Sequence, residues 1–291
     1  MTAADGLLII DKPAGWTSHD VVARLRRLTG TRRVGHAGTL DPLATGVLVV
    51  GVGKATRLLG HLALAEKEYL ATIRLGQATS TGDAEGDVIS GAPATGVTLA
   101  AVRAAAASLT GQIEQVPPAV SAVKVAGTRA YRLARAGTPP ALAPRVVTVK
   151  SFRVIEERRV ADLLDVDVAV TCSSGTYIRA LARDMGEALG VGGHVTVLRR
   201  TRAGPYDLSL AHGLENLDAA QALIPLERAA ADAFPSRLLT DEEARWLSHG
   251  GRLPGAGVAP GPVAAFGPDG TLIALVAEKD GQTAPLAVFV P

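Results

Sequence analysis

An alternating pattern of apolar and polar residues runs along residues 69–75 and again along residues 163–171. A period of two places successive side chains on opposite faces of a β-strand, so each segment predicts a strand with one buried face. Apolar runs at residues 6–10 and 47–52 lack this alternation, which is typical of strands buried on both faces. Because such strands are stable only when other elements cover them, the four segments predict a sheet with helices packed against it.

Helical signals separate these strands. Thr17 or Ser18 can cap a helix that ends at Gly30, since short hydroxyl side chains begin helices and glycine ends them. Residues 99–109 are rich in alanine, and residues 178–189 have apolar positions at helical spacing. The order of the segments predicts the α+β class.

The character of the sequence changes beyond about residue 236. A short helical segment at residues 241–247 precedes a Gly- and Pro-rich loop that runs to residue 262, and two or three short apolar strands follow. A chain of 291 residues suits one large domain and one small one. We therefore expect residues 1–235 to form the main domain and residues 236–291 a small β-rich one.

Charge and cysteine content exclude several classes of protein. The net charge of +2 and the pI of about 8.8 are too weakly basic to argue for nucleic acid by themselves. Cys172 is the one cysteine, which excludes a disulfide within the chain and a zinc site built from several cysteines. The apolar runs are too short for a signal sequence or a membrane span, so we expect a soluble, cytoplasmic protein.

Motifs for nucleotides and metals are incomplete. The pair at residues 53–54 resembles the end of a phosphate-binding loop, but Leu48 and Ala55 stand where that motif needs glycine and a hydroxyl. The dinucleotide pattern that begins at Gly51 ends on Thr56 instead of glycine. The six histidines show no paired metal-binding spacing. We therefore assign no nucleotide-binding motif and no metal.

A glycine-rich segment at residues 35–46 carries His36 and Asp41 between a basic helix end and a buried strand. Glycines let the backbone approach a ligand closely, and loops held by a rigid scaffold often carry site residues. A single carboxylate there can act in nucleophilic or acid–base chemistry. The structural alternative is that Asp41 only caps a helix that starts at Pro42, and His36 is equally open to a structural role.

A basic segment without acidic residues spans residues 117–145 and includes Tyr131. Its cations are Lys124, Arg129, Arg132, Arg135 and Arg145. Guanidinium groups pair with phosphate and aromatic rings stack on unpaired bases, so the segment suits RNA, although a solvated helical face would give the same pattern. A second basic cluster, formed by Arg199, Arg200 and Arg202, follows a predicted strand.

Residues 172–179 join a strand to a helix through Gly175. The glycine permits a tight turn, and the free N–H groups at the start of the helix can bind an anion. Cys172 ends an apolar strand, where a thiol is more often inert packing than a nucleophile.

Several motifs, taken in order along the chain, resemble those of the bacterial tRNA pseudouridine synthase B (TruB) family. They are residues 35–46 with Leu40-Asp41-Pro42, then Lys67-Glu68-Tyr69, residues 124–137 with Ala130-Tyr131, residues 172–179, and Leu198-Arg199-Arg200, with Lys12-Pro13, Gly15 and Arg74-Leu75-Gly76 in agreement. The resemblance covers residues 6–210 well and the tail loosely. It implies the pseudouridine synthase fold, a central mixed and mainly antiparallel β-sheet flanked by helices, with a small PUA-like C-terminal domain.

The resemblance also implies an activity, the conversion of uridine 55 in the T-loop of tRNA to pseudouridine. N1 of a flipped-out base would be cut from its ribose, and C5 would be joined in its place, with no cofactor and no metal needed. Asp41 would be the essential carboxylate, and Arg179 would pair with it. Tyr69 would stack on the base and could act as a general base, while Tyr177 and Leu198 would wall the pocket. The chemical route, by attack of Asp41 on ribose, addition to the base or a glycal, stays open.

The same resemblance assigns RNA contacts outside the pocket. His36 would press into the RNA loop, Lys12 would contact RNA near the active site, and Lys124, Arg129 and Arg132 would belong to an RNA-clasping insertion at about residues 117–145. The expected partner is the T-arm stem-loop of tRNA, bound by a monomer without a protein partner or a membrane. A non-catalytic RNA-binding protein and an RNA-guided relative are the alternatives.

Overall fold

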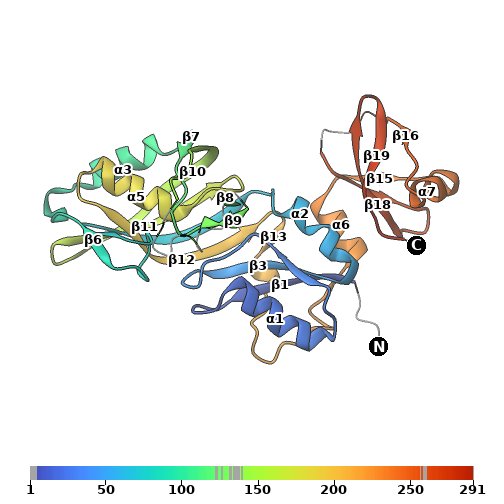
Figure 1. Cartoon of the computed structure of the whole chain (residues 1–291), viewed down its shortest axis with the longest axis horizontal. Coiled ribbons are helices and arrows are strands. Elements are labelled where there is room, and N and C mark those ends of the chain that lie inside the picture. Colours follow the sequence, from blue (N-terminus) through green and yellow to red (C-terminus); the bar gives the residue numbers. More distant parts are fainter. Residues whose placement is uncertain are drawn as a thin grey trace.

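The computed structural model describes residues 5–121, 124–125, 127–130, 133, 138, 140–255, 257 and 261–290. A large sheet fills the left and centre of Figure 1, and a smaller one stands at the right. The helices are α1 (Ser18–Thr29), α2 (Leu59–Leu62), α3 (Leu99–Ser108), α5 (Ile178–Ala188), α6 (Leu226–Ala233) and α7 (Asp241–Ser248), with 3-10 turns η1 (Gly53–Arg57), η2 (Ala94–Gly96) and η3 (Leu208–Leu210).

The large sheet has ten strands. Its main order is β14 (Ile224–Pro225), β1 (Gly6–Lys12), β3 (Thr45–Val52), β12 (Gly193–Ala203), β4 (Lys67–Leu75), β11 (Leu163–Cys172), β10 (Arg145–Val160) and β7 (Gly111–Gln115), with β13 (Tyr206–Asp207) beside β12 and β2 (Val34–Ala37) beside β3. β3 and β12 run parallel, whereas β1 with β3, β12 with β4 and β4 with β11 run antiparallel. The expected mixed, mainly antiparallel sheet is confirmed.

Strand β1 is buried on both faces, as its unbroken apolar run predicts. Leu8 and Ile10 pack into one core with Val21 and Leu25 of α1. Leu7 and Ile9, which point the other way, pack into a second core under α2 and α6.

Helix α1 begins and ends where the sequence indicates. The Thr17 hydroxyl accepts a hydrogen bond from the Asp20 N–H at 3.1 Å, and the Asp20 carboxylate accepts one from the Thr17 N–H at 2.9 Å. This reciprocal cap satisfies N–H groups that the helix itself leaves free. Gly30 closes the helix with a φ of 65°, a conformation that favours glycine.

Helices α3 and α5 cover one face of the large sheet (Figure 1). Their apolar faces meet the alternating strands, and Ile73, Val168 and Leu181 are fully buried in the shared core. The predictions for residues 69–75, 163–171, 99–109 and 178–189 are therefore confirmed.

The second sheet has the order β15 (Ser236–Leu238), β17 (Val263–Phe266), β18 (Leu272–Lys279), β19 (Gln282–Val288) and β16 (Leu253–Pro254). Leu247 of α7 packs on one side of it with Val263 and Val276. On the other side, Phe266 and Leu272 pack into the core that α6 also enters. Two hairpins, β5 (Ala78–Thr79) with β6 (Val88–Ser90) and β8 (Lys124–Val125) with β9 (Thr128–Arg129), complete the fold.

Candidate active site

Asp41 lies in the loop between β2 and β3, close to the parallel pairing of β3 with β12. No helix starts at Pro42; instead the Asp41 carbonyl accepts a hydrogen bond from the Ala44 N–H at 3.1 Å, which closes a turn. The Ser18 hydroxyl holds the preceding residue, accepting from the Leu40 N–H at 2.9 Å. The helix-cap alternative for Asp41 is therefore wrong, since the loop is built by tertiary contacts.

Arg179 of α5 meets this loop. Its Nε lies 2.9 Å from Oδ2 of Asp41, in an ion pair rather than a well-aligned hydrogen bond. The Arg179 side chain is 4% exposed, whereas that of Asp41 is 36% exposed. A buried guanidinium thus faces a carboxylate that stays open to a ligand.

The rest of the Arg179 guanidinium is fixed by main-chain carbonyls. One terminal nitrogen donates to the Thr81 carbonyl at 2.7 Å, and the other donates to the Val120 carbonyl at 2.9 Å. Because all three nitrogens are engaged, the charge cannot swing away from Asp41 without breaking buried hydrogen bonds.

Asp83 is a second carboxylate at Arg179, and the sequence analysis missed it. Its Oδ2 lies 3.6 Å from Nε of Arg179, and its side chain is buried. The Thr81 hydroxyl and the Glu85 N–H donate to its other oxygen. Burial, together with the negative charges of Asp83 and Asp41, raises the pKa of Glu85. The arginine therefore lies among three acidic groups.

Tyr69 of β4 is buried beside Asp41. Burial raises the pKa of its hydroxyl, the Arg200 guanidinium opposes that rise, and the charge of Asp41 adds to it. The phenol therefore stays protonated at neutral pH, which fits a stacking or proton-holding group better than a phenolate base.

Leu198 and Tyr177 belong to the same region. Leu198 is buried in the core that also contains Leu40 and Tyr69. Tyr177 precedes α5, and its backbone is clamped by Gln115, whose amide accepts from the Tyr177 N–H at 2.8 Å and donates to its carbonyl at 3.1 Å. Burial raises the pKa of the Tyr177 hydroxyl, which lies near enough to Asp41 to feel its charge.

Lys12 does not fit the predicted RNA contact. Its side chain is fully buried, and its ammonium donates to the carbonyls of Pro13 at 2.9 Å, Trp16 at 2.6 Å and Pro42 at 3.2 Å. Burial lowers its pKa to about 8. All three of its donors face the main chain, and the bond to Pro42 ties Lys12 to the Asp41 loop.

Two further predicted RNA contacts are His36, which precedes the Asp41 loop in the sequence, and the insertion at about residues 117–145, which follows it. His36 is half-buried on β2, and its ring meets that of His19 edge-to-face at 5.6 Å. Lys124 and Arg129 are paired in the β8–β9 hairpin, although their side chains lie outside the described part of the structure. Arg132 lies outside the described residues altogether.

The second basic cluster is not a free surface patch. Arg199 pairs with Asp11 at 2.7 Å, and Arg202 pairs with Glu68 at 2.7 Å. Arg200 is 1% exposed. Cys172 is also buried, and burial raises the pKa of its thiol to about 11, which supports inert packing.

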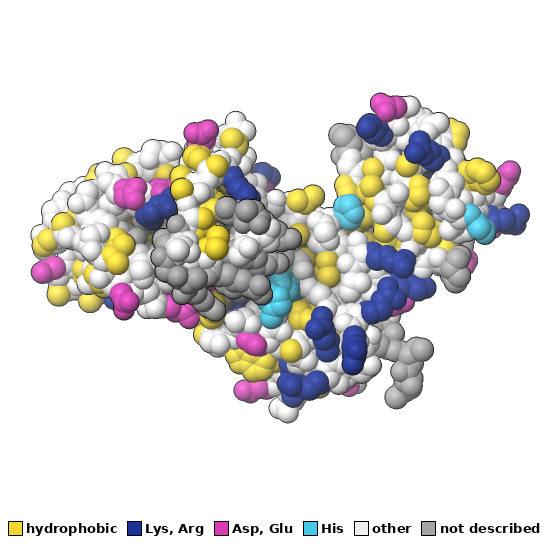
Figure 2. Space-filling model, viewed as in Figure 1, with side chains coloured by type: hydrophobic (Ala, Val, Ile, Leu, Met, Phe, Trp, Pro, Cys, Tyr) yellow, Lys and Arg dark blue, Asp and Glu magenta, His cyan; other side chains and the backbone are white. Residues whose placement is uncertain are grey.

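Exposed cations gather elsewhere, over α1 and the turn that follows it. They are Arg26, Arg27, Arg32, Arg33 and, on the neighbouring turn η1, Arg57. In Figure 2, Lys and Arg side chains form a band from the lower centre toward the second sheet. The sequence totals concealed this band because acidic residues elsewhere balance its charge.

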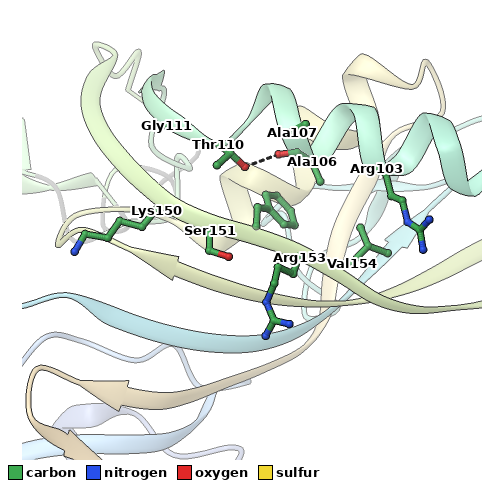
Figure 3. Close-up of a pocket in the computed structure, with 10 residues that line it drawn as sticks. Arg103, Ala106, Ala107, Thr110, Gly111, Lys150, Ser151, Arg153 and Val154 are labelled. Carbon is green, nitrogen blue, oxygen red and sulfur yellow. Dashed lines mark hydrogen bonds between the residues drawn. The ribbon is translucent and has the colours of Figure 1, made fainter.

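A groove of about 680 Å³ lies apart from these residues, between α3 and β10 (Figure 3). Arg103, Lys150 and Arg153 border it, and no predicted site residue lines it. Among the described residues, no group of three or more His, Cys, Asp or Glu could hold a metal ion. Within the same residues, no helix is long and apolar enough to cross a membrane.

Comparison with known families gives matches over most of the chain. Residues 26–178 match the family described as TruB family pseudouridylate synthase, N-terminal domain. Residues 179–240 match a tRNA pseudouridylate synthase B C-terminal domain, and residues 234–290 match tRNA pseudouridine synthase II, C-terminal.

Individual relatives agree with these matches. The chain is 60% identical to tRNA pseudouridine synthase B of Thermobifida fusca over 290 residues, which cover 98% of this chain and 99% of the relative. It is 55% identical to the protein of the same name from Streptomyces griseus over 293 residues, covering 99% and 98%.

Solved structures show the same architecture. An H/ACA RNP bound to a substrate RNA containing 2'-deoxyuridine superposes with a TM-score of 0.73 at 28% identity, covering 98% of this chain and 85% of that one. A Cbf5-Nop10-Gar1 complex gives a TM-score of 0.73 at 30% identity, covering 100% and 85%.

Proposed function

Because the chain belongs to the TruB family of pseudouridylate synthases, we propose that it converts uridine 55 in the T-loop of tRNA to pseudouridine, with Asp41 as the essential carboxylate. The observation that carries this proposal is the ion pair between the half-open Asp41 and the buried Arg179. A protein that only binds RNA has no need for a buried arginine that pairs with a half-exposed carboxylate as well as with the buried Asp83.

In this reaction the bond between N1 and the ribose C1′ breaks, and a bond between C5 and C1′ forms. The C5 proton is lost and N1 gains a proton, so the product is an isomer of the substrate. An ionised carboxylate at Asp41 can attack the ribose, add to the base or assist a glycal route, and Arg179 supplies its counter-charge in each case. All three routes need the carboxylate of Asp41 to stay paired with Arg179.

The uridine must leave its stack before Asp41 can reach it. Flipping costs a few kcal/mol, which contacts in the pocket offset. We assign stacking on the base to the protonated Tyr69, the pocket walls to Leu198 and Tyr177, and pressure on the RNA loop to His36. The shared core of Tyr69 and Leu198, and the charge of Asp41 felt by Tyr69 and Tyr177, support the roles given to these three residues.

The RNA contacts that we propose beyond the pocket are made by positively charged side chains. We propose that the insertion at about residues 117–145, with Lys124, Arg129 and Arg132, clasps the T-arm, and that the arginine band over α1 binds RNA phosphates. Residues 1–235 would form the catalytic domain and residues 236–291 a PUA-like domain. The enzyme would act as a cytoplasmic monomer without cofactor or protein partner.

The deciding experiment measures pseudouridine formation on an unmodified tRNA transcript with the protein alone. Wild-type turnover supports an enzyme that needs no guide RNA, while binding without turnover would support the non-catalytic alternative. Asp41→Asn should abolish nearly all turnover and keep most RNA affinity. Asp11→Asn is the matched control, because Asp11 is 35% exposed and also pairs with an arginine, and it should leave turnover within a few-fold of wild type.

A further inference from the structure

The loop that carries Asp41 is held at both ends by one side chain. Nε of Arg200 donates to the Val47 carbonyl at 2.7 Å, and one terminal nitrogen donates to the Gly38 carbonyl at 3.0 Å. Gly38 and Val47 bracket the loop, with Asp41 between them. A single buried guanidinium therefore ties the beginning of the loop to its end.

The backbone of Arg200 makes the same junction rigid. Arg200 lies opposite Gly46 in the parallel pairing of β12 with β3. A Cβ added at Gly46 would come 2.2 Å from the Arg200 carbonyl oxygen, and Gly46 has a φ of 98°. Because glycine alone tolerates both conditions, the strand and the loop end pack without a gap.

Arg200 also contacts the other half of the pocket. It lies opposite Tyr69 in the antiparallel pairing of β12 with β4. A Cβ added at Gly38 would lie 3.5 Å from a terminal nitrogen of Arg200 and 3.8 Å from Cε of Lys67, the residue two before Tyr69. The guanidinium thus lies between the Asp41 loop and the strand that presents Tyr69.

The electrostatics of this position are unfavourable for stability alone. Within the described residues Arg200 forms no ion pair, and the neighbouring Lys67 ammonium donates to the carbonyls of Ala63 and Ala65 rather than to an acid. A buried cation whose partners are main-chain carbonyls and the neutral Tyr69 hydroxyl, rather than a carboxylate, costs stability compared with an apolar side chain of similar volume. The arrangement is better explained by the geometry that it imposes.

We infer that Arg200 is a positioning residue, whose guanidinium closes the 38–47 loop and so fixes Asp41 relative to Tyr69 and Arg179. This inference rests on the proposed function, since it deepens the account of the same site. A displacement of about 1 Å at a reacting group can lower a rate on the order of 10²-fold, so loss of the closure should act on chemistry more than on RNA binding.

The test compares Arg200→Lys and Arg200→Met with the wild type in three measurements: the single-turnover rate on tRNA transcript, the tRNA dissociation constant, and hydrogen exchange of residues 38–47. Arg200→Met should lower the rate on the order of 10²-fold, keep the dissociation constant within about three-fold, and speed exchange in the loop about ten-fold or more. Arg200→Lys, which can reach one carbonyl at a time, should give intermediate values.

Arg159→Met is the control for the loss of a guanidinium that bridges two carbonyls. Arg159 donates to the Ala94 carbonyl at 2.8 Å and the Val97 carbonyl at 2.6 Å, far along the chain from the Asp41 loop. Its rate should stay within about two-fold of wild type.

Two results would overturn the inference: a folded Arg200→Met or Arg200→Lys protein with unchanged loop exchange, or one whose single-turnover rate lies within about three-fold of wild type. If Arg200→Met does not fold, Arg200→Lys alone decides. An inactive wild type would refute the proposed function instead, and loop exchange would still report whether Arg200 closes the loop.

Discussion

The two sheets of this protein bury different kinds of side chain. Around the large sheet, the buried ions are Lys12, Lys67, Asp83, Asp165, Arg179 and Arg200. Within residues 236–288, as far as they are described, the buried polar side chain is Thr283, and the rest of the interior is apolar. The large sheet thus carries a desolvation cost that the small sheet avoids.

Three of these buried ions, whose desolvation costs stability, contact Asp41 or its loop. Lys12 bonds to Pro42, Arg200 bonds to Gly38 and Val47, and Arg179 pairs with Asp41 itself. Main-chain carbonyls and ion pairs are directional, whereas apolar packing is not. The large sheet therefore exchanges stability for a fixed carboxylate, whereas the interior of the small sheet is built mainly from apolar side chains.

Among the buried ions of the large sheet, Arg179 should give the largest effect on stability and turnover when it is replaced, as in Arg179→Met. The substitution leaves Asp83 buried without its partner, so the free energy of unfolding should fall by about 3 to 5 kcal/mol. Turnover should fall on the order of 10³-fold or more, because Asp41 loses its counter-charge as well. Urea unfolding and single-turnover kinetics measure the two losses.

Arg183→Met serves as the control for Arg179→Met. Arg183 lies one turn further along α5, pairs with Asp184 at 2.6 Å, and is 31% exposed. Its loss should change stability by less than about 1 kcal/mol. Equal losses in the two variants would contradict the view that burial, rather than helix position, makes Arg179 important.

A large effect on stability without an effect on chemistry is expected in the small sheet. Leu247→Ala removes a fully buried side chain from its core and should lower the free energy of unfolding by about 2 to 5 kcal/mol. Turnover per folded molecule should stay near that of wild type, because no ion near Asp41 moves. Leu238→Ala, at a side chain 79% exposed, controls for the change in composition.

The contrast also explains what the sequence could predict. Alternation located the strands at residues 69–75 and 163–171, and apolar runs located those at residues 6–10 and 47–52. Hydroxyl and glycine placement located the ends of α1 and the Asp41 loop, because these signals depend on residues near one another in the chain. The long strand β10 gave no such signal. The Asp41 loop also carries a motif that resembles the TruB family's, and the same resemblance assigned Arg179 as the partner of Asp41. Asp83 gave no signal, since a lone aspartate in a polar turn is ordinary until the β5–β6 hairpin brings it to α5.

Buried cations were the least predictable feature. A lysine or arginine in a sequence is expected at the surface, so Lys12 was assigned to RNA and Arg200 to a basic cluster. Their burial is decided by carbonyls from distant segments, such as Pro42 for Lys12 and Gly38 for Arg200. No local pattern marks such acceptors.

The smallest expected effect is a change in stability with pH, caused by the titration of one buried ion, Lys67. Lys67 is 6% exposed, and burial lowers the pKa of its ammonium from 10.5 to about 8. Above pH 8 the unfolded chain therefore holds a proton that the folded protein has lost, and this group's contribution to stability rises with pH.

In Lys67→Met this contribution is absent, so the stability of wild type relative to the variant should rise by about 1 kcal/mol between pH 7 and pH 9. Urea unfolding at pH 7, 8 and 9 measures the difference, and Lys150→Met, which removes an ammonium from a side chain 65% exposed, corrects for the loss of surface charge. A difference that stays constant with pH would mean that the carbonyls of Ala63 and Ala65 compensate the burial of this cation in full. In that case the burial of Lys67 would cost the large sheet no stability, and this ion would not distinguish the large sheet from the small one.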